Sequence, residues 1–120
     1  MNRWSLLEHK IERSDFFEIH YDFLLENGAD CLTWKIFEIP KINGSLIKIV
    51  KQPNHRLVWL SREKKNLSRE RGFVIKIDNG TYSLLQKEIN VDNFSLILNG
   101  KLLRGVFLKT GNICQLISKD

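Results

Sequence analysis

A histidine and an aspartate two residues apart, His20 and Asp22, are the first side chains in the sequence that suggest chemistry. They lie in a segment, 18–26, in which apolar and polar residues alternate with a period of two, as in a half-buried strand. Side chains two apart in a strand share a face, so the imidazole and the carboxylate point the same way. Such a mixed nitrogen and oxygen pair suits a divalent metal ion. The simpler interpretation, a solvated strand face with two unrelated polar residues, stays open on this pattern alone.

Two further histidines extend the set of candidate residues. His9 ends a first candidate strand at 3–9, and His55 lies in a loop that precedes a short strand at 56–59. A neutral imidazole is the commonest protein metal ligand, and a protonated one binds phosphate. Taken singly, each histidine is more simply a surface or core residue. The sequence has no Gly-x-Ser-x-Gly motif, no phosphate-binding glycine loop and no Cys-x-x-Cys pair. Metal-assisted or histidine-assisted phosphate chemistry is therefore the leading enzymatic hypothesis, beside the hypothesis that the chain is no enzyme.

Composition indicates one folded domain over residues 1–120. Hydrophobic residues make up 42% of the chain and only two residues are proline, which argues against disorder. The two cysteines, Cys31 and Cys114, lie far apart and are interpreted as buried free thiols. No segment approaches the roughly 18 apolar residues of a membrane helix, and the start lacks the layout of a signal peptide. We therefore expect a cytoplasmic protein without membrane association.

The charge balance is moderately basic, with a net charge of +5 and a pI near 9.4. Such a balance fits a polyanionic partner, although many basic proteins have none. The segment 62–71 carries five positive charges in ten residues. It is either a solvated loop or a contact surface for phosphates.

The turn residues predict the elements that would position these side chains. Asn-Gly occurs four times, at 27–28, 43–44, 79–80 and 99–100, and this pair favours type I′ hairpin turns. Three of the pairs join alternating apolar segments, which predicts hairpins 18–26/30–37, 73–78/81–85 and 94–98/101–108. With strands at 3–9 and 112–118, the pattern predicts an all-β fold: a compact antiparallel β-barrel of about eight strands. At most one or two short helices are expected, near 10–17 and Leu67.

An ordered series of segments resembles the 3′-phosphoesterase domain of bacterial DNA ligase D, in particular its small stand-alone relatives. The segment His20-Tyr21-Asp22-Phe23-Leu24-Leu25-Glu26 is similar to that family's signature His-Tyr-Asp-Phe-Arg-Leu-Glu. The resemblance covers nearly the whole chain. The other similar segments are the opening strand 4–9, the segment Leu32-Thr33-Trp34-Lys35 where the family has a Leu-x-x-Trp strand leading to a proline (here at 40), the His-x-Leu segment 55–59, the segment 71–82 with its Gly-x-Val-x-x-x-Asp-x-Gly-Thr pattern, and the closing strands 98–105 and 112–117.

The resemblance implies a manganese-dependent enzyme of DNA repair that removes 3′-phosphates or terminal ribonucleosides from nucleic acid 3′ ends. It assigns the metal to His9, His20 and Asp22, and catalysis to His55 and His20. Phosphate binding would fall on His55, with Trp59 at the position of a helping tyrosine. Basic residues of this sequence that could add phosphate contacts are Arg56 and Arg71, together with Arg62 and Arg69. The expected partners are nucleic acid 3′ ends and a separate ligase or polymerase, with the chain itself a monomer.

The sequence departs from the family pattern at three places. Leu24 replaces the signature arginine, a phosphate ligand, and Trp59 replaces a tyrosine. The stretch between His9 and His20 is longer than usual, and without a gap Ser14 would take the place of His9. We expect Leu24 to face the site without supporting the core, so that Leu24→Arg would raise activity and leave the fold intact. A nucleic-acid-end binding module without turnover is the alternative function, and a protein-interaction barrel without any nucleic acid role is the third.

Overall fold

The chain folds almost entirely into antiparallel strands. The structure, a computed structural model, describes residues 2–67 and 72–119. Its elements, in chain order, are β1 (Arg3–Glu12), β2 (Phe17–Asn27), β3 (Asp30–Ile36), β4 (Ile47–Arg56), the 3₁₀ helix η1 (Leu57–Leu60), β5 (Lys64–Asn66), β6 (Phe73–Leu84), β7 (Asn93–Asn99), β8 (Arg104–Thr110) and β9 (Ile113–Ile117). The all-β prediction is confirmed, and no helix of the described residues is long and apolar enough to span a bilayer.

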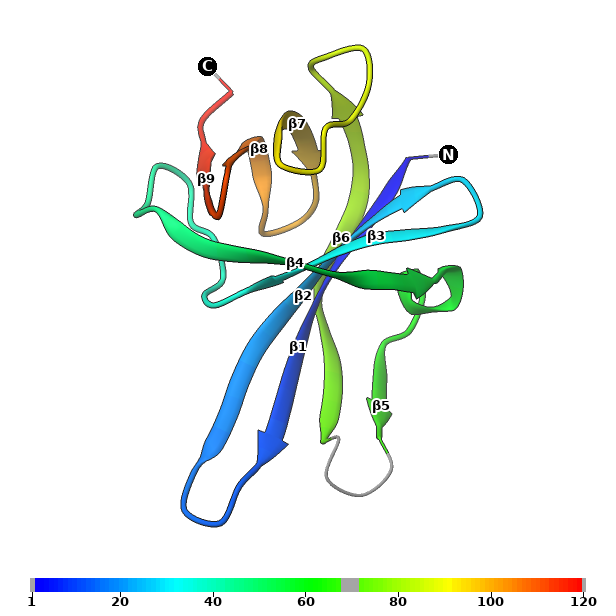
Figure 1. The fold of residues 1–120 in the computed structure, drawn as a ribbon, viewed down its shortest axis with the longest axis vertical. Helices are drawn as coiled ribbons and strands as arrows, with labels where there is room; N and C mark the ends of the chain where they lie inside the picture. The colour runs from blue at the N-terminus through cyan, green and yellow to red at the C-terminus, as the bar shows by residue number, and fades with distance from the viewer. Residues whose placement is uncertain (1, 68–71, 120) are drawn as a thin grey trace.

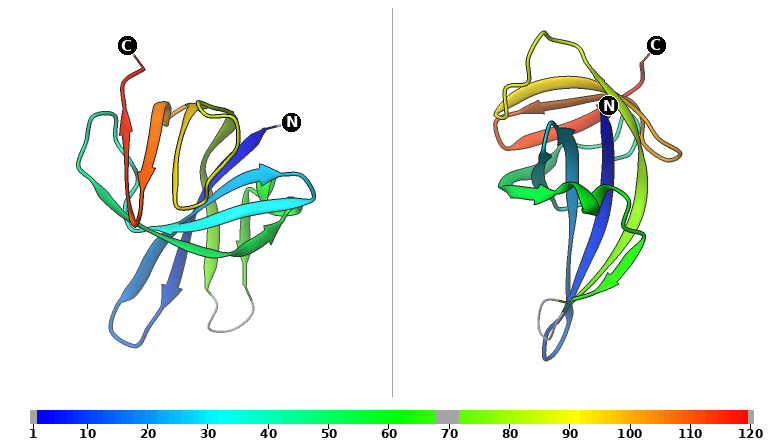
Figure 2. Two further views of the ribbon diagram at one scale, coloured as in Figure 1. Left: turned by 45° about the horizontal axis from the view of Figure 1, so that its top comes forward. Right: turned by 90° about the vertical axis from the view of Figure 1, so that its right-hand side faces the viewer.

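Eight of the strands close into a barrel-like ring within the described part of the chain. The order is β1-β2-β3-β4-β9-β8-β7-β6, and β6 pairs back to β1, while β5 adds to the outer edge of β6. The β1–β6 contact is long, from Arg3↔Thr81 to Lys10↔Phe73, whereas β4 and β9 pair only at Ile47↔Cys114 and Lys48↔Ile113. Strands β7, β8 and β9 lie at one end of the molecule, and the long β1–β2 hairpin reaches away from them (Figures 1 and 2). The contact between β4 and β9, which we call the seam of the ring, is therefore much shorter than the contact between β1 and β6.

Both faces of the first strands are buried, each against a different apolar cluster. Leu6 and Phe23 belong to the main core inside the ring, with Trp34, Leu96 and Phe107. The opposite face of the same strands contributes to a second, smaller cluster under η1. Its buried members are Leu7, Leu24, Cys31, Leu60 and Val74. Cys31 and Cys114 are both buried and unpaired, as predicted, and burial raises the pKa of Cys31 to about 11 and that of Cys114 to about 12.

Several local predictions were wrong. Residues 10–17 form the end of β1, a short loop and the start of β2 rather than a helix, and Leu67 directly follows β5. The predicted strand at 56–59 is instead the end of β4 and most of η1. The turn after Asn99 is longer than the two-residue type, since β8 begins only at Arg104.

The Asn79-Gly80 pair is not a turn but the middle of β6, which runs unbroken from Phe73 to Leu84. Gly80 is needed there for close approach: a Cβ atom on it would lie 1.7 Å from the Asn99 carbonyl oxygen. Asp78 faces the loop after β7 and accepts backbone N–H bonds from Lys101, Leu102 and Leu103. These contacts join β6 to the next hairpin, so the glycine serves packing rather than chain reversal.

Candidate metal centre

The three predicted metal ligands meet on neighbouring strands. His9 of β1 lies directly opposite His20 of β2, and their ring centroids are 4.7 Å apart with an interplanar angle of 67°. Asp22 is two residues beyond His20 and so shares its face. This register contradicts the ungapped alternative, because Ser14 is exposed in the loop at the hairpin tip. The longer connection between the two histidines is accommodated as an extension of the β1–β2 hairpin.

The potential ligand atoms are close enough to share one ion. Asp22 Oδ2 lies 3.9 Å from His9 Nδ1, and Asp22 Oδ1 lies 3.4 Å from His20 Nε2. One ligand atom from each residue can be chosen so that all lie within 4.8 Å of one another. Ligands about 2.0–2.2 Å from a common ion lie about 3 Å apart when they meet it at right angles. A small inward movement of the side chains would therefore complete a three-ligand site.

The environment of this group fits a bound cation. His20 and Asp22 retain only 7% and 8% of their accessible surface, which is low for an ionisable pair. Within the described residues, His20 Nδ1 is buried without a hydrogen-bond partner. Buried polar atoms are normally satisfied. The described residues leave this nitrogen of the His20 ring without a partner, while the other ring nitrogen, Nε2, lies beside Asp22. Two imidazoles and one carboxylate suit manganese, iron or zinc, and they leave coordination positions open.

The metal group opens onto a cavity of about 650 Å³ that three of the predicted phosphate-binding residues also line. His55, Arg56 and Trp59 line the same cavity as His9, His20 and Asp22. The rings of His55 and Trp59 lie beside each other, with centroids 6.1 Å apart. The expectation that His55 faces the cavity of His20 is therefore met. Arg71 and Arg69 lie outside the described residues.

An irregularity in β4 sets the face of the sheet on which His55 lies. Thr33 of β3 pairs with Gln52, but Cys31, two residues before it, pairs with His55, three residues further along β4. The extra residue in β4 is a β-bulge, which reverses the alternation and places His55 on the face of Thr33 and Gln52. The ring is then fixed by a 3.2 Å hydrogen bond between His55 Nδ1 and the Pro53 carbonyl oxygen. Since a carbonyl only accepts, Nδ1 is the donor, and Nε2 is the acceptor of the neutral ring.

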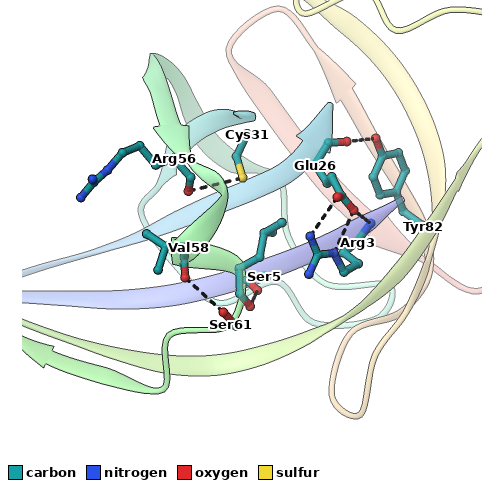
Figure 3. A network of polar contacts seen from close by, with 9 residues as sticks. Arg3, Ser5, Glu26, Cys31, Arg56, Val58, Ser61 and Tyr82 are labelled. Atoms are coloured by element: carbon teal, nitrogen blue, oxygen red, sulfur yellow. Dashed lines mark hydrogen bonds and ion pairs between the residues drawn. The ribbon is translucent and has the colours of Figure 1, made fainter. Parts of the chain in front are cut away.

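Short polar contacts hold the segment after His55 against the strands below it (Figure 3). The Ser5 hydroxyl donates to the Leu60 carbonyl at 2.8 Å, and the Cys31 thiol donates to the Arg56 carbonyl at 3.9 Å. They fix η1 over the second cluster and thereby position Trp59. The Arg62 guanidinium lies 5.1 Å from the centre of the Trp59 ring, within cation–π range.

Leu24 corrects one expectation. It shares a face with His20 and Asp22, as the alternation predicts, but it is fully buried in the second cluster under η1 and does not line the cavity. The idea that no core packing depends on Leu24 is wrong. An arginine at this position would have to enter an apolar cluster in which Leu24 is fully buried, so Leu24→Arg is no longer expected to raise activity.

Sequence reasoning missed Lys35 as a residue of the cavity. Lys35 lies directly opposite Asp22 on β3 and lines the cavity, as do Gln52 and Asn54 of β4. The strand 30–37 was predicted, but its register against β2 was not, and only the register shows that Lys35 neighbours Asp22. Lys35 therefore adds a positively charged residue to the lining of the cavity.

Comparison of the chain with protein-family models found no match, and comparison with curated proteins found none either.

Proposed function

We propose that the chain is a metal-dependent phosphoesterase that acts on phosphate groups at nucleic acid 3′ ends. The observation that supports the proposal is one cavity that is lined both by three metal-type ligands, His9, His20 and Asp22, and by His55 and Arg56. The resemblance of the segment 20–26 to the ligase D phosphoesterase signature supplies the substrate class. A 3′-phosphate or a terminal ribonucleoside is the group to be removed.

The side chains take complementary roles in this proposal. His9, His20 and Asp22 hold a divalent cation such as manganese, which polarises a phosphate oxygen and activates water when it is bound. His55, held through Nδ1, presents Nε2 to bind the phosphate or to carry a proton. Lys35 and Arg56 provide the positive charge that the signature arginine provides in the resembled family. In the hydrolysis of a 3′-phosphate, the oxygen of a water molecule forms a bond to phosphorus. The bond between phosphorus and the sugar 3′ oxygen breaks, and the 3′ oxygen takes up a proton to become a hydroxyl group.

The test is manganese-dependent release of inorganic phosphate from an oligonucleotide with a 3′-phosphate. Asp22→Asn removes a charged ligand and is expected to lower the rate by more than about 10-fold, since loss of even an outer-shell partner of a metal site costs about 10- to 100-fold. The matched control is Asp15→Asn, since Asp15 is an exposed carboxylate in the hairpin loop outside the cavity. Release of phosphate by Asp22→Asn at the wild-type rate would refute the proposal.

Metal binding is measured separately from turnover. Manganese is expected to raise the melting temperature of the wild type and of His55→Gln but not that of Asp22→Asn, because a ligand that binds only the folded state stabilises it. A His55→Gln protein that binds manganese but releases phosphate slowly would assign His55 to the substrate rather than to the metal.

A nucleic-acid-end binding module without turnover is the second candidate, and one observation favours it. Leu24 stands where the resembled family has a phosphate-binding arginine, and it is buried in an apolar cluster. Loss of a bidentate guanidinium removes a strong charge-assisted contact to phosphate. Metal-dependent binding of a 3′-phosphate oligonucleotide without any release of phosphate would support the module over the enzyme.

A further inference from the structure

The positive charge of the chain is concentrated in one stretch. From Lys35 to Arg62 the sequence has six lysines and arginines and a single acidic residue, Glu38, which equals the net charge of +5 of the whole chain. The remaining residues are therefore neutral in sum. This stretch runs from the end of β3 through β4 and η1, and two of its basic residues, Lys35 and Arg56, line the cavity.

The register of three strands places part of this charge on the face that carries the metal group. Asp22 of β2 pairs with Lys35 of β3, which pairs with Val50 of β4, so the three side chains lie in a row. Lys48 is two residues from Val50 and shares that face. The intervening residues Ile36 and Ile49 point the other way, into the main core.

An exposed aromatic ring lies between the two lysines of this face. Phe37 directly follows β3 and keeps 42% of its accessible surface. The ammonium of Lys48 lies 5.2 Å from the centre of its ring and that of Lys35 lies 6.0 Å away. Val50 beside them is also exposed. We call Lys35, Phe37, Lys48 and Val50 the β3–β4 outer face.

The β3–β4 outer face is continuous with the cavity, because Lys35 belongs to both. Two strand spacings separate β2 from β4, about 10 Å. That distance equals roughly three stacked nucleotides at about 3.4 Å each. Aromatic rings flanked by cationic side chains are the usual means by which proteins hold single-stranded nucleic acid, with bases stacked on the rings and phosphates near the cations.

We propose that the β3–β4 outer face binds the last few single-stranded nucleotides before the 3′ terminus. A base stacks on Phe37, and the phosphates on either side of it contact Lys35 and Lys48. The direction of the strand, with its 3′ end in the cavity, rests on the proposed function; the binding of single strands does not.

The other exposed aromatic group suits a polyanion less well. Phe16 and Phe17 lie at the tip of the β1–β2 hairpin and are 61% and 56% exposed. The hairpin segment 10–18 contains two basic residues but three acidic ones, and Arg13 is already paired with Glu18 at 3.1 Å. Charge therefore favours the β3–β4 outer face over the hairpin tip.

The test measures binding of a 5′-labelled oligothymidylate of about 12 nucleotides with a 3′-phosphate, by fluorescence anisotropy in low salt with EDTA. Phe37→Ala is expected to weaken binding about 5- to 100-fold, the range for loss of one stacked base. Lys48→Gln is expected to reduce the slope of log affinity against log salt by about 0.7. The matched controls are Phe16→Ala and Lys87→Gln, an exposed aromatic and an exposed lysine elsewhere on the surface. Both should bind like the wild type.

Each outcome bears on one proposal. The proposal that the β3–β4 outer face binds single strands is refuted if the wild type does not bind the oligonucleotide, or if Phe37→Ala and Lys48→Gln bind it as tightly as the wild type. It is also refuted if a blunt duplex binds the wild type as tightly as the oligonucleotide does and loses as much affinity in Phe37→Ala. If these variants lose binding but the wild type releases no phosphate with any divalent metal, the phosphoesterase proposal fails and the single-strand surface stands. If the wild type releases phosphate and both variants bind normally, the single-strand surface fails and the phosphoesterase proposal stands. Thermal melting checks that the exposed substitutions leave the fold intact.

Discussion

At the scale of single residues, Asp22 and Leu24 share one face of β2 but have different surroundings. Both point to the same side of β2, but Asp22 borders an open cavity while Leu24 lies under η1 with Leu7 and Leu60. The apolar cluster that buries Leu24 adjoins the cavity, since its members Leu7 and Val74 also line the cavity. Position along the strand, rather than side-chain alternation, decides whether a residue can serve the site.

Substitutions of Leu24 are predicted to act on stability. Leu24→Met conserves volume and should cost less than about 1.5 kcal/mol of unfolding free energy. Leu24→Ala should cost about 2–5 kcal/mol, and Leu24→Arg should cost more still, because a guanidinium would be buried without a partner. Urea unfolding followed by tryptophan fluorescence measures all three. An arginine variant as stable as the methionine variant would mean that the cluster opens to solvent more easily than its burial indicates.

Among the elements, the ends of β1 and β2 are tied together by an ion pair outside the cavity. Arg3 donates two side-chain hydrogen bonds to Glu26, both at 2.9 Å, and its backbone N–H adds a third. The Tyr82 hydroxyl donates to the Glu26 backbone carbonyl at 2.6 Å, which brings β6 into the same contact (Figure 3). The side-chain hydrogen bond from Arg3 lowers the pKa of Glu26 from its ordinary value of 4.5 to about 2.

The ion pair between Arg3 and Glu26 is predicted to make the stability of the fold decrease at acidic pH. The pKa of Glu26 is lower in the folded than in the unfolded chain, so its contribution is complete above about pH 4.5 and is lost as the pH falls toward 2. Glu26→Gln should melt below the wild type at neutral pH, and the difference should shrink between pH 4.5 and 2. Melting temperatures across this range, with Glu12→Gln as an exposed control, provide the measurement. A difference that stays constant with pH would contradict the assignment.

The elements could be predicted from sequence where they depend on neighbouring residues, but not where they depend on contacts between strands that are distant in sequence. The alternation of 18–26 predicted β2 and the shared face of His20 and Asp22, because a strand's period of two is a local property. Asn79-Gly80 was wrongly predicted as a turn. The glycine is needed there because the Asn99 backbone, about twenty residues away in sequence, approaches too closely for any side chain. The bulge that turns His55 toward the cavity and the register that sets Lys35 beside Asp22 are likewise products of pairing between strands.

In the whole molecule, β1 and β6 form the long contact that closes the ring, from Arg3↔Thr81 to Lys10↔Phe73. The Asp78 side chain of β6 binds the backbone of the loop between β7 and β8. Its carboxylate is buried yet accepts N–H bonds from Leu103, Lys101, Leu102 and Asn79 at 2.8–3.0 Å. Although burial opposes ionisation, these four bonds together hold the pKa of Asp78 below its ordinary value.

Removal of the Asp78 carboxylate is predicted to destabilise the whole fold. Asp78→Ala leaves several backbone donors without acceptors and should cost about 3–5 kcal/mol of unfolding free energy. Asp78→Asn keeps one acceptor oxygen and should cost less. Urea denaturation gives both values, and Asp15→Ala, in the exposed hairpin loop, should stay within about 0.5 kcal/mol of the wild type. Equal costs for Asp78→Ala and Asp15→Ala would show that water replaces the carboxylate in the loop.

The short contact between β4 and β9 has a consequence for how the molecule moves. Regions with few paired residues open locally at a lower free energy than the rest of a fold. The Ile49 amide, which donates across this seam to Asn112, should exchange its hydrogen at least about 10-fold faster than amides in the middle of β1. His9, His20 and Asp22 all lie on β1 and β2, away from the seam. Manganese should therefore slow exchange in β1 and β2 but leave that of Ile49 almost unchanged, so the ring would open at its seam while its metal centre stays assembled.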